Sequence, residues 1–342
     1  MVIGGGVIGL VLIGLLVFLG VRALGGDDEP TANPTTSEPS GQPSTPGTEP
    51  TGQPSGEPSG EPTNNPPAGS LGNATGQAKG ATDKLQSAGY QCSDLFNGAQ
   101  GAHRGCFKYD GATSAEVIYQ FQPDGTITGV LMKSQDRDNV NNAGVTFDAA
   151  LQAIGNDTFG GSEVAKVQAA VKTGQKSQKV GSSWGEFQLS NNGDNLQLRG
   201  GKSGSDSYEL PRKQFETTEA QLQAALKPKQ YNCSTSCRKT VGKYGSQTIY
   251  GYGSSGGGLR VFDIRVSGDT DDVKAALPVA VGDGFGALKG PDVAAVKAYV
   301  DSHNDGKSYA SYVSGWRVEI TTNNDDDYSS QTISVRYESF YV

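Results

Sequence analysis

The four cysteines are the residues of this sequence whose spacing indicates their chemistry most clearly. Cys92 and Cys106 form one pair, and Cys233 and Cys237 form a second, closer pair. An even count grouped two and two predicts disulfides made in an oxidising compartment. The second pair is spaced Cys-x3-Cys, which is neither a redox Cys-x-x-Cys nor half of a two-part zinc pattern. We therefore predict one structural disulfide within each pair. Bonds between the pairs, or free thiols in a reducing compartment, are the alternatives.

The sequence contains no motif that indicates catalysis or a metal centre. It has two histidines, His103 and His303, and no Gly-x-Ser-x-Gly, His-Glu-x-x-His or phosphate-loop motif. The acidic run at residues 323–327 offers oxygen ligands, but it lacks the glycine and the terminal glutamate of an EF-hand loop. We predict that this run is a solvated hairpin turn. The expectation is a protein that is not an enzyme, with no catalytic residue, no metal and no cofactor.

Tyrosines are the remaining candidates for a binding site. We name Tyr250, Tyr252, Tyr309 and Tyr312 as candidate binding residues, because tyrosine offers contact area at a low cost in conformational entropy. Half-buried strand positions also favour tyrosine, which leaves a structural role open.

An internal repeat must position these residues. The spacing Leu-x4-Tyr-x-Cys leads into Cys92 and again into Cys233. Further matches follow in the same order: 117–121 with 248–252, 149–151 with 275–277, 159–160 with 285–286, Trp184 with Trp316, 191–193 with 323–325, and Leu196 and Leu198 with Ile333 and Val335. Such collinear order predicts a duplication, with repeat 1 at residues 79–213 and repeat 2 at residues 214–342. The two tryptophans occupy matching positions, which favours a role in each core.

Each repeat has the same predicted order of elements. Apolar periodicity predicts helices at 81–88, 146–154 and 162–173 and strands at 116–122, 126–133, 183–190 and 195–199 in the first repeat. In the second it predicts helices at 218–226, 270–280 and 291–302 and strands at 248–252, 259–266, 315–322 and 331–339. The cysteine segments are expected to be loops. Hairpin-linked strands make an antiparallel sheet whose apolar face the helices cover, so we predict an α+β fold used twice. Whether the two sheets lie side by side or are joined as beads stays open.

An apolar run at residues 2–24 precedes the repeats. As a helix it would be about 34 Å long, enough for a bilayer core of about 30 Å. We predict a transmembrane signal-anchor helix at residues 1–26, with the lipid bilayer as its partner. A cleaved signal peptide is the alternative, although the run is longer than a usual signal core. No basic residue precedes the run, which raises the hypothesis that this start lies inside a longer gene product.

A low-complexity segment at residues 27–78 follows. Eleven of the 16 prolines lie here, four of them in degenerate Gly-Gln-Pro-Ser, Gly-Glu-Pro-Ser and Gly-Glu-Pro-Thr units. Its low-complexity part, residues 30–70, has no large apolar residue to bury and cannot build a core, so we predict a disordered, extended linker that carries the repeats away from a membrane. Together with the paired cysteines, the linker favours repeats that lie outside the cell.

The net charge of the chain argues against one class of partner, nucleic acid. The chain carries a net charge of −8 and shows no basic stripe, so we expect no nucleic acid partner. The layout resembles that of surface proteins and receptor ectodomains of Gram-positive, especially actinobacterial, cells; this likeness of layout implies no family. We predict a single-pass, membrane-anchored binding or sensing protein for an unknown extracellular protein or cell-wall ligand. The alternative is a structural or envelope-assembly factor without a small-molecule ligand.

Overall fold

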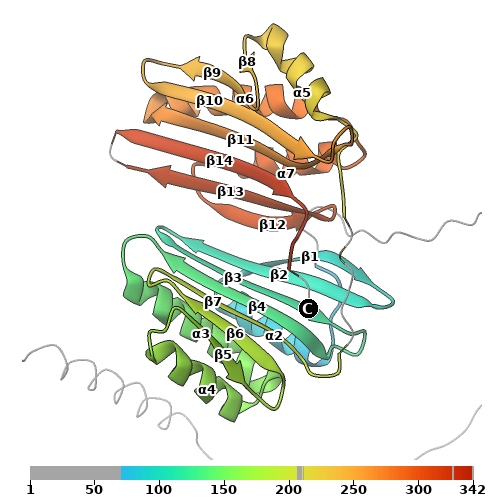
Figure 1. Cartoon of the computed structure of the whole chain (residues 1–342), viewed down its shortest axis with the longest axis vertical. Helices are drawn as coiled ribbons and strands as arrows, with labels where there is room; N and C mark the ends of the chain where they lie inside the picture. The colour runs from blue at the N-terminus through green and yellow to red at the C-terminus, as the bar shows by residue number, and fades with distance from the viewer. Residues whose placement is uncertain (1–70, 206–209, 211, 326, 341–342) are drawn as a thin grey trace, which may run out of the picture. The chain divides into compact units, whose positions relative to one another are not determined.

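Two antiparallel sheets of seven strands each carry the fold (Figure 1). The computed structural model describes residues 71–205, 210, 212–325 and 327–340. The predicted membrane segment and nearly all of the predicted linker lie outside these residues. No helix in the described part of the chain is long and apolar enough to cross a membrane.

The first sheet combines seven strands with three helices. The strands are β1 (Gln91–Gly98), β2 (Gly101–Asp110), β3 (Thr113–Phe121), β4 (Ile127–Asp136), β5 (Ser177–Gly181), β6 (Glu186–Asn191) and β7 (Asn195–Gly201). They pair in the order β1-β2-β3-β4-β7-β6-β5. The helices α2 (Gly76–Ser87), α3 (Val140–Thr158) and α4 (Gly161–Lys172) cover one face. Their apolar residues, such as Phe147, join inward strand residues such as Val117 in one core.

The second sheet repeats this plan. Its strands are β8 (Asn232–Cys233), β9 (Cys237–Val241), β10 (Gly245–Gly253), β11 (Leu259–Asp269), β12 (Tyr309–Val313), β13 (Trp316–Asn324) and β14 (Tyr328–Arg336). The helices are α5 (Glu219–Leu226), a 3-10 turn η1 (Lys227–Lys229), α6 (Thr270–Ala287) and α7 (Val293–Ser302). Leu222, Phe285 and Val296 bring the three α-helices into the core of this sheet.

The shared topology confirms the predicted duplication. The second sheet has the order β8-β9-β10-β11-β14-β13-β12, so each strand occupies the place of its counterpart in the first. A row of buried, paired residues crosses each sheet from its disulfide: Cys106, Val117, Met132, Leu198 and Leu189 in the first, and Cys237, Ile249, Ile264, Ile333 and Ile320 in the second. Two α+β repeats with one strand order are therefore present.

The register changes which tyrosines correspond. The sequence match sets Tyr119 against Tyr250, but the paired rows make Ile118 the counterpart of Tyr250. Side chains alternate along a strand, so a shift of one residue moves a side chain to the other face. Tyr119 is fully buried under the helices, whereas Tyr250 lies on the face without helices and is 39% exposed.

The cysteine segments form strands where loops were expected. β1 and β2 make a hairpin with a bulge between Asp94 and Phe96, and β9 extends the second sheet. β5 and β12 are further strands that the periodicity missed. Each is only five residues long, so the alternation of apolar and polar side chains that marks a strand is too short to recognise.

Helix ends also differ from expectation. α2 begins at Gly76, within the range assigned to the linker, and α7 begins at Val293, two residues after Pro291. α6 continues past Pro278 to Ala287, because its buried residues continue to the end of the helix, as Phe285 shows. Thr218 caps α5 in a capping box.

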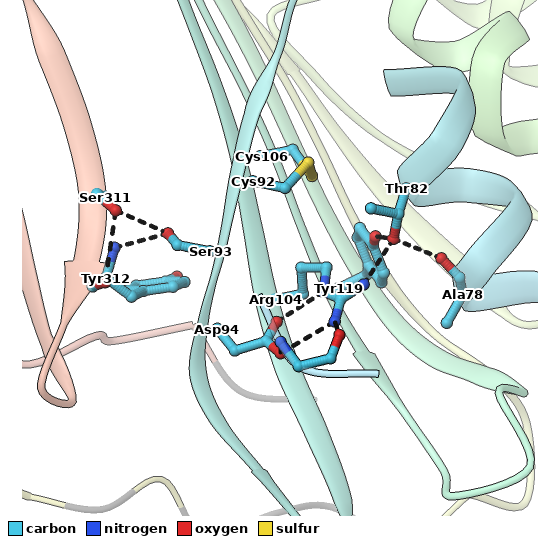
Figure 2. The surroundings of a disulfide bond; sticks show 11 residues. Ala78, Thr82, Cys92, Ser93, Asp94, Arg104, Cys106, Tyr119, Ser311 and Tyr312 are labelled. Atoms are coloured by element: carbon cyan, nitrogen blue, oxygen red, sulfur yellow. Dashed lines mark hydrogen bonds and ion pairs between the residues drawn. A yellow bond between two sulfur atoms is a disulfide. The ribbon is translucent and has the colours of Figure 1, made fainter. Parts of the chain in front are cut away.

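Both predicted disulfides are confirmed. Cys92 is bonded to Cys106 across β1 and β2, and Cys233 is bonded to Cys237 across β8 and β9. Figure 2 shows the first bond beside a buried ion pair in which Arg104 Nε lies 2.6 Å from a carboxylate oxygen of Asp94. Each bond joins directly paired positions of neighbouring strands, so it holds the outermost hairpin of its sheet together.

Candidate functional site: the junction between the repeats

Strand β12 of the second repeat lies on the face of β1 and β2 that carries no helix. β12 is an edge strand, so its outward N–H groups have no strand partner. The backbone N–H of Tyr312 instead donates to Ser93 Oγ over 2.8 Å, and Ser311 Oγ donates to the same oxygen over 3.0 Å (Figure 2). A side chain of the first repeat thereby satisfies the edge of the second.

Apolar residues from both repeats fill the rest of this contact. Leu95 and Phe107 of the first repeat pack with Ala310 and Tyr312 of the second, and Leu210 joins the cluster. A second group joins Ile118 and Leu131 to Phe340 near the chain's end. The face of the first sheet opposite its helices is therefore a packed surface.

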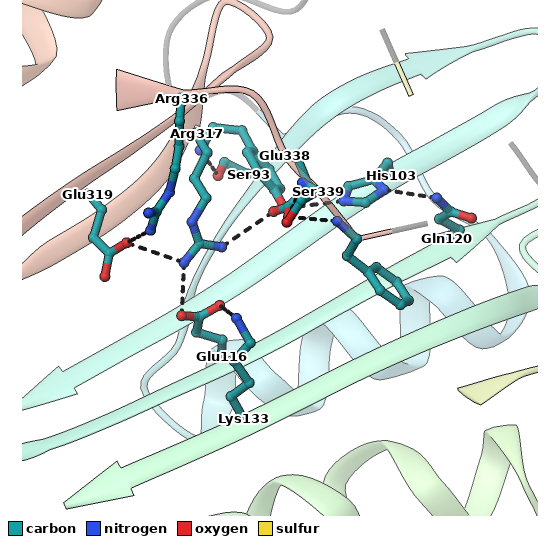
Figure 3. A network of polar contacts seen from close by, with 12 residues as sticks. Ser93, His103, Glu116, Gln120, Lys133, Arg317, Glu319, Arg336, Glu338 and Ser339 are labelled. Carbon is teal, nitrogen blue, oxygen red and sulfur yellow. Dashed lines mark hydrogen bonds and ion pairs between the residues drawn. The ribbon is translucent and has the colours of Figure 1, made fainter. Parts of the chain in front are cut away.

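A charged network lies in the same contact (Figure 3). Arg317 of β13 reaches Glu116 of β3 over 2.8 Å and Glu338 over 3.3 Å. Lys133 also lies 3.6 Å from Glu116. Burial alone would raise the pKa of Glu338, but the charge of Arg317, together with hydrogen bonds from the Tyr312 hydroxyl and the Phe340 N–H, outweighs it and lowers that pKa to about 2. Separating the partners of such a buried pair would leave uncompensated charges, which is costly in free energy. These ion pairs therefore favour one relative position of the two repeats.

His103 completes the network as a neutral side chain. It is fully buried, and burial lowers its pKa to about 4. The amide nitrogen of Gln120 lies 3.2 Å from Nδ1, so Nε2 carries the proton and donates to the Tyr312 hydroxyl over 3.2 Å. Tyr312 in turn donates to Glu338. Gln120, His103, Tyr312 and Glu338 are all buried, so these hydrogen bonds serve to join the repeats.

A cleft opens at one end of this junction. It has a volume of about 850 Å³. Its lining comes from residues 109–112 and 137–138 of the first repeat and residues 306–309 and 322–325 of the second. Arg137 Nη1 donates to Asn323 Oδ1 over 2.8 Å across the cleft. Neither repeat could form this cleft alone.

The cleft combines aromatic rings with charges of both signs. Tyr109 and Tyr309 face it from the two repeats, and the Tyr109 hydroxyl donates to Glu319 over 3.3 Å. Arg137 and Lys307 supply the positive charges. Asp110, Asp138 and Asp325 supply the negative ones. No group of three or more potential metal ligands occurs among the residues that the structure describes.

The four candidate tyrosines lie in three different places. Tyr309 lines the cleft, where its hydroxyl donates to Asp305 over 2.7 Å. Tyr312 is 1% exposed and belongs to the junction. Tyr250 and Tyr252 lie together on the second sheet, opposite its helices, and are 39% and 66% exposed. We call this surface the open face and define it by Arg238, Thr248, Tyr250, Tyr252 and Arg265.

Sequence reasoning missed Tyr109, Arg137 and Lys307 as residues of the cleft. Tyr109 lies at the end of β2, Arg137 follows β4 and Lys307 precedes β12, and no spacing rule connects segments that meet only in the folded chain. The acidic run predicted as a hairpin turn begins within β13, which ends at Asn324 and pairs with β14 from Tyr328 on, and Asn323, Asn324 and Asp325 line the cleft. A comparison of the two repeats could have indicated the cleft, because the connecting segments that line it differ in length and charge between the repeats whereas the strands match.

Comparisons with protein-family models, with curated proteins and with solved structures find no match for this chain.

Proposed function

We propose that this chain is a membrane-anchored, extracytoplasmic binding protein, and that the junction cleft holds its ligand. The observation that carries the proposal is a cleft of about 850 Å³ whose walls come from both repeats. Ligand sites favour such concave places between packed units. The buried junction supports a fixed cleft, because a preorganised site loses less entropy on binding.

The covalent chemistry supports an extracytoplasmic location. Two disulfides favour an oxidising environment, such as the outer side of a cell membrane. The apolar run at residues 2–24 and the proline-rich segment after it supply an anchor and a spacer for such a location.

The charges of the cleft select a class of ligand. Arg137 and Lys307 can pair with carboxylates, and Asp110 and Asp138 can pair with ammonium groups. Tyr109 and Tyr309 add flat surfaces for a ring or an aliphatic stem. A wall fragment that carries a sugar and a short peptide with free amino and carboxylate groups presents all of these features.

Binding is tested with a defined muropeptide of that kind and the full chain in nanodiscs. We expect calorimetric binding that Lys307→Gln weakens about tenfold, the effect of losing one charge-assisted hydrogen bond. Lys176→Gln is the matched control, because Lys176 is an exposed lysine outside the cleft lining. An affinity that Lys307→Gln leaves unchanged would contradict the cleft as the site.

Location is tested separately on intact cells. A membrane-impermeant amine reagent is expected to label the repeats without opening the cells. Labelling that needs broken cells would contradict the extracytoplasmic assignment. A protein that is labelled on intact cells but binds no muropeptide would favour the alternative, a structural factor whose linker and repeats act only as a spacer.

A further inference from the structure

The open face of the second repeat corresponds to the surface that the first repeat uses for the junction. By register, Arg238 is the counterpart of Phe107, and Tyr250 is the counterpart of Ile118. Tyr252 likewise corresponds to Gln120. One duplicated surface is thus buried in the first repeat and exposed in the second.

A second copy of this chain does not suit the open face. The strand that would dock there is β5, the counterpart of β12. β5 has Lys179 where β12 has Ala310, and Gly181 where β12 has Tyr312. The apolar anchor of the junction is missing from β5, and an arginine replaces the phenylalanine that would receive it. We therefore expect the open face to bind a ligand other than a second copy of this chain.

Unpaired positive charge distinguishes the open face. Arg238 and Arg265 are exposed and have no ion-pair partner in the part of the chain that the structure describes. Of the nearby carboxylates, Glu319 pairs with Arg336 over 2.7 Å, and Asp263 accepts a hydrogen bond from Tyr250 and keeps its charge, which leaves two arginines against one carboxylate. The face is thus locally positive although the chain has a net charge of −8.

The two arginines are spaced for repeated anions. They lie in one register row, on either side of Thr248 and two strands apart. At ~4.8 Å per strand their Cα atoms are about 10 Å apart, too far for one carboxylate to bridge both. Each guanidinium can hold its own carboxylate or phosphate through two hydrogen bonds. A polymer with regularly spaced anions fits this row.

Tyr250 and Tyr252 add ring surfaces beside that row. Their positions two residues apart put both rings on the same side of β10. Sugar rings stack their C–H faces on exposed aromatic rings. Thr248 and Asp263 on this side are polar, and Val261, paired with Tyr252, is the one apolar neighbour in these rows, whereas the core of a protein–protein interface is mostly apolar.

We propose that the open face binds an extended anionic polysaccharide through Arg238, Arg265, Tyr250 and Tyr252. This is a second site, separate from the cleft, and it does not depend on what the cleft binds.

The test uses polygalacturonate and the full chain in nanodiscs of zwitterionic lipid. Methyl-esterified polygalacturonate is the control, because it keeps the backbone and loses the charge. We expect the acid polymer to bind at least about tenfold more tightly than the ester, and the difference to shrink with added salt. The double variant Arg238→Gln/Arg265→Gln should lose the preference for the acid form, while Lys172→Gln, far from this face, should keep it.

Three further variants make the outcome specific. Tyr252→Ala should weaken binding, and Tyr252→Phe should restore it because the ring is kept. Lys307→Gln should leave polygalacturonate binding unchanged, which separates this site from the cleft. Equal affinity for acid and ester, or no effect of the arginine variants, would overturn the proposal. Tighter binding of oligothymidylate would overturn it in favour of a nucleic acid, and self-association by light scattering in favour of a second copy.

Discussion

Acidification should weaken the fold through one buried histidine. His103 has an ordinary pKa of 6.5 when the chain is unfolded, and burial in the folded protein lowers it to about 4. The unfolded state therefore takes up a proton first as the pH falls. Stability from this group is fully present above the unfolded pKa and is lost as the pH falls from about 6.5 towards 4.

The size of the effect follows from the two pKa values. Between pH 7 and pH 5 the linkage relation gives a loss of about 2 kcal/mol for a single group shifted this far. Glu338, with its pKa lowered to about 2, contributes mainly below pH 4.5, so this interval isolates His103. Urea unfolding of the full chain in detergent, followed by tryptophan fluorescence, measures the change. Neither tryptophan lies in the predicted membrane segment.

A His103→Gln variant provides the comparison. Glutamine keeps a donor near Tyr312 and does not titrate, so the loss between pH 7 and pH 5 should fall to a few tenths of a kcal/mol. A variant that loses as much stability as the parent over this interval would refute the assignment of the pH dependence to His103.

The remaining predictions concern the junction and the first disulfide. Arg317→Met removes the ion-pair partner of the buried Glu338 and leaves Glu116 with only Lys133 at 3.6 Å, so it should lower the free energy of unfolding by about 3–5 kcal/mol, as measured in urea. Gly105→Ala would place a methyl group 2.7 Å from the ring of Tyr312 and should cost about 1–3 kcal/mol by the same measurement. Replacing Cys92 and Cys106 with alanine should cost about 3 kcal/mol, because their bond closes a loop of about 15 residues. Alkylation of the native chain should modify none of its cysteines; modification of either would contradict the bond.

The repeat and its disulfides could be predicted because they depend on local order. The spacing before Cys92 and Cys233 is the same in both copies, and each cysteine pair lies within one repeat. Hairpins such as β3 with β4 also follow from alternation and a Pro-Asp-Gly turn. Features that lie close together in the sequence leave a pattern in it.

The junction could not be predicted for the opposite reason. Ser93 meets Tyr312, and Glu116 meets Arg317, across about two hundred residues of chain. Such a contact needs the register of two sheets, and the sequence match, shifted by one residue, already sets Tyr250 against Tyr119, whose side chain lies on the opposite face of its sheet. The buried histidine was equally hidden, because nothing in the residues around His103 indicates that another repeat covers it.

The central claim is that the two repeats form one body, and the tryptophans allow a direct test. Trp184 lies in the core of the first repeat and Trp316 in the core of the second. In Trp184→Phe and Trp316→Phe proteins, the fluorescence of the remaining tryptophan reports one repeat, and far-ultraviolet circular dichroism reports both. We predict that the two signals coincide in a single urea transition in each variant. Two separated transitions would show that the repeats unfold independently, and would contradict a junction that holds the cleft in place.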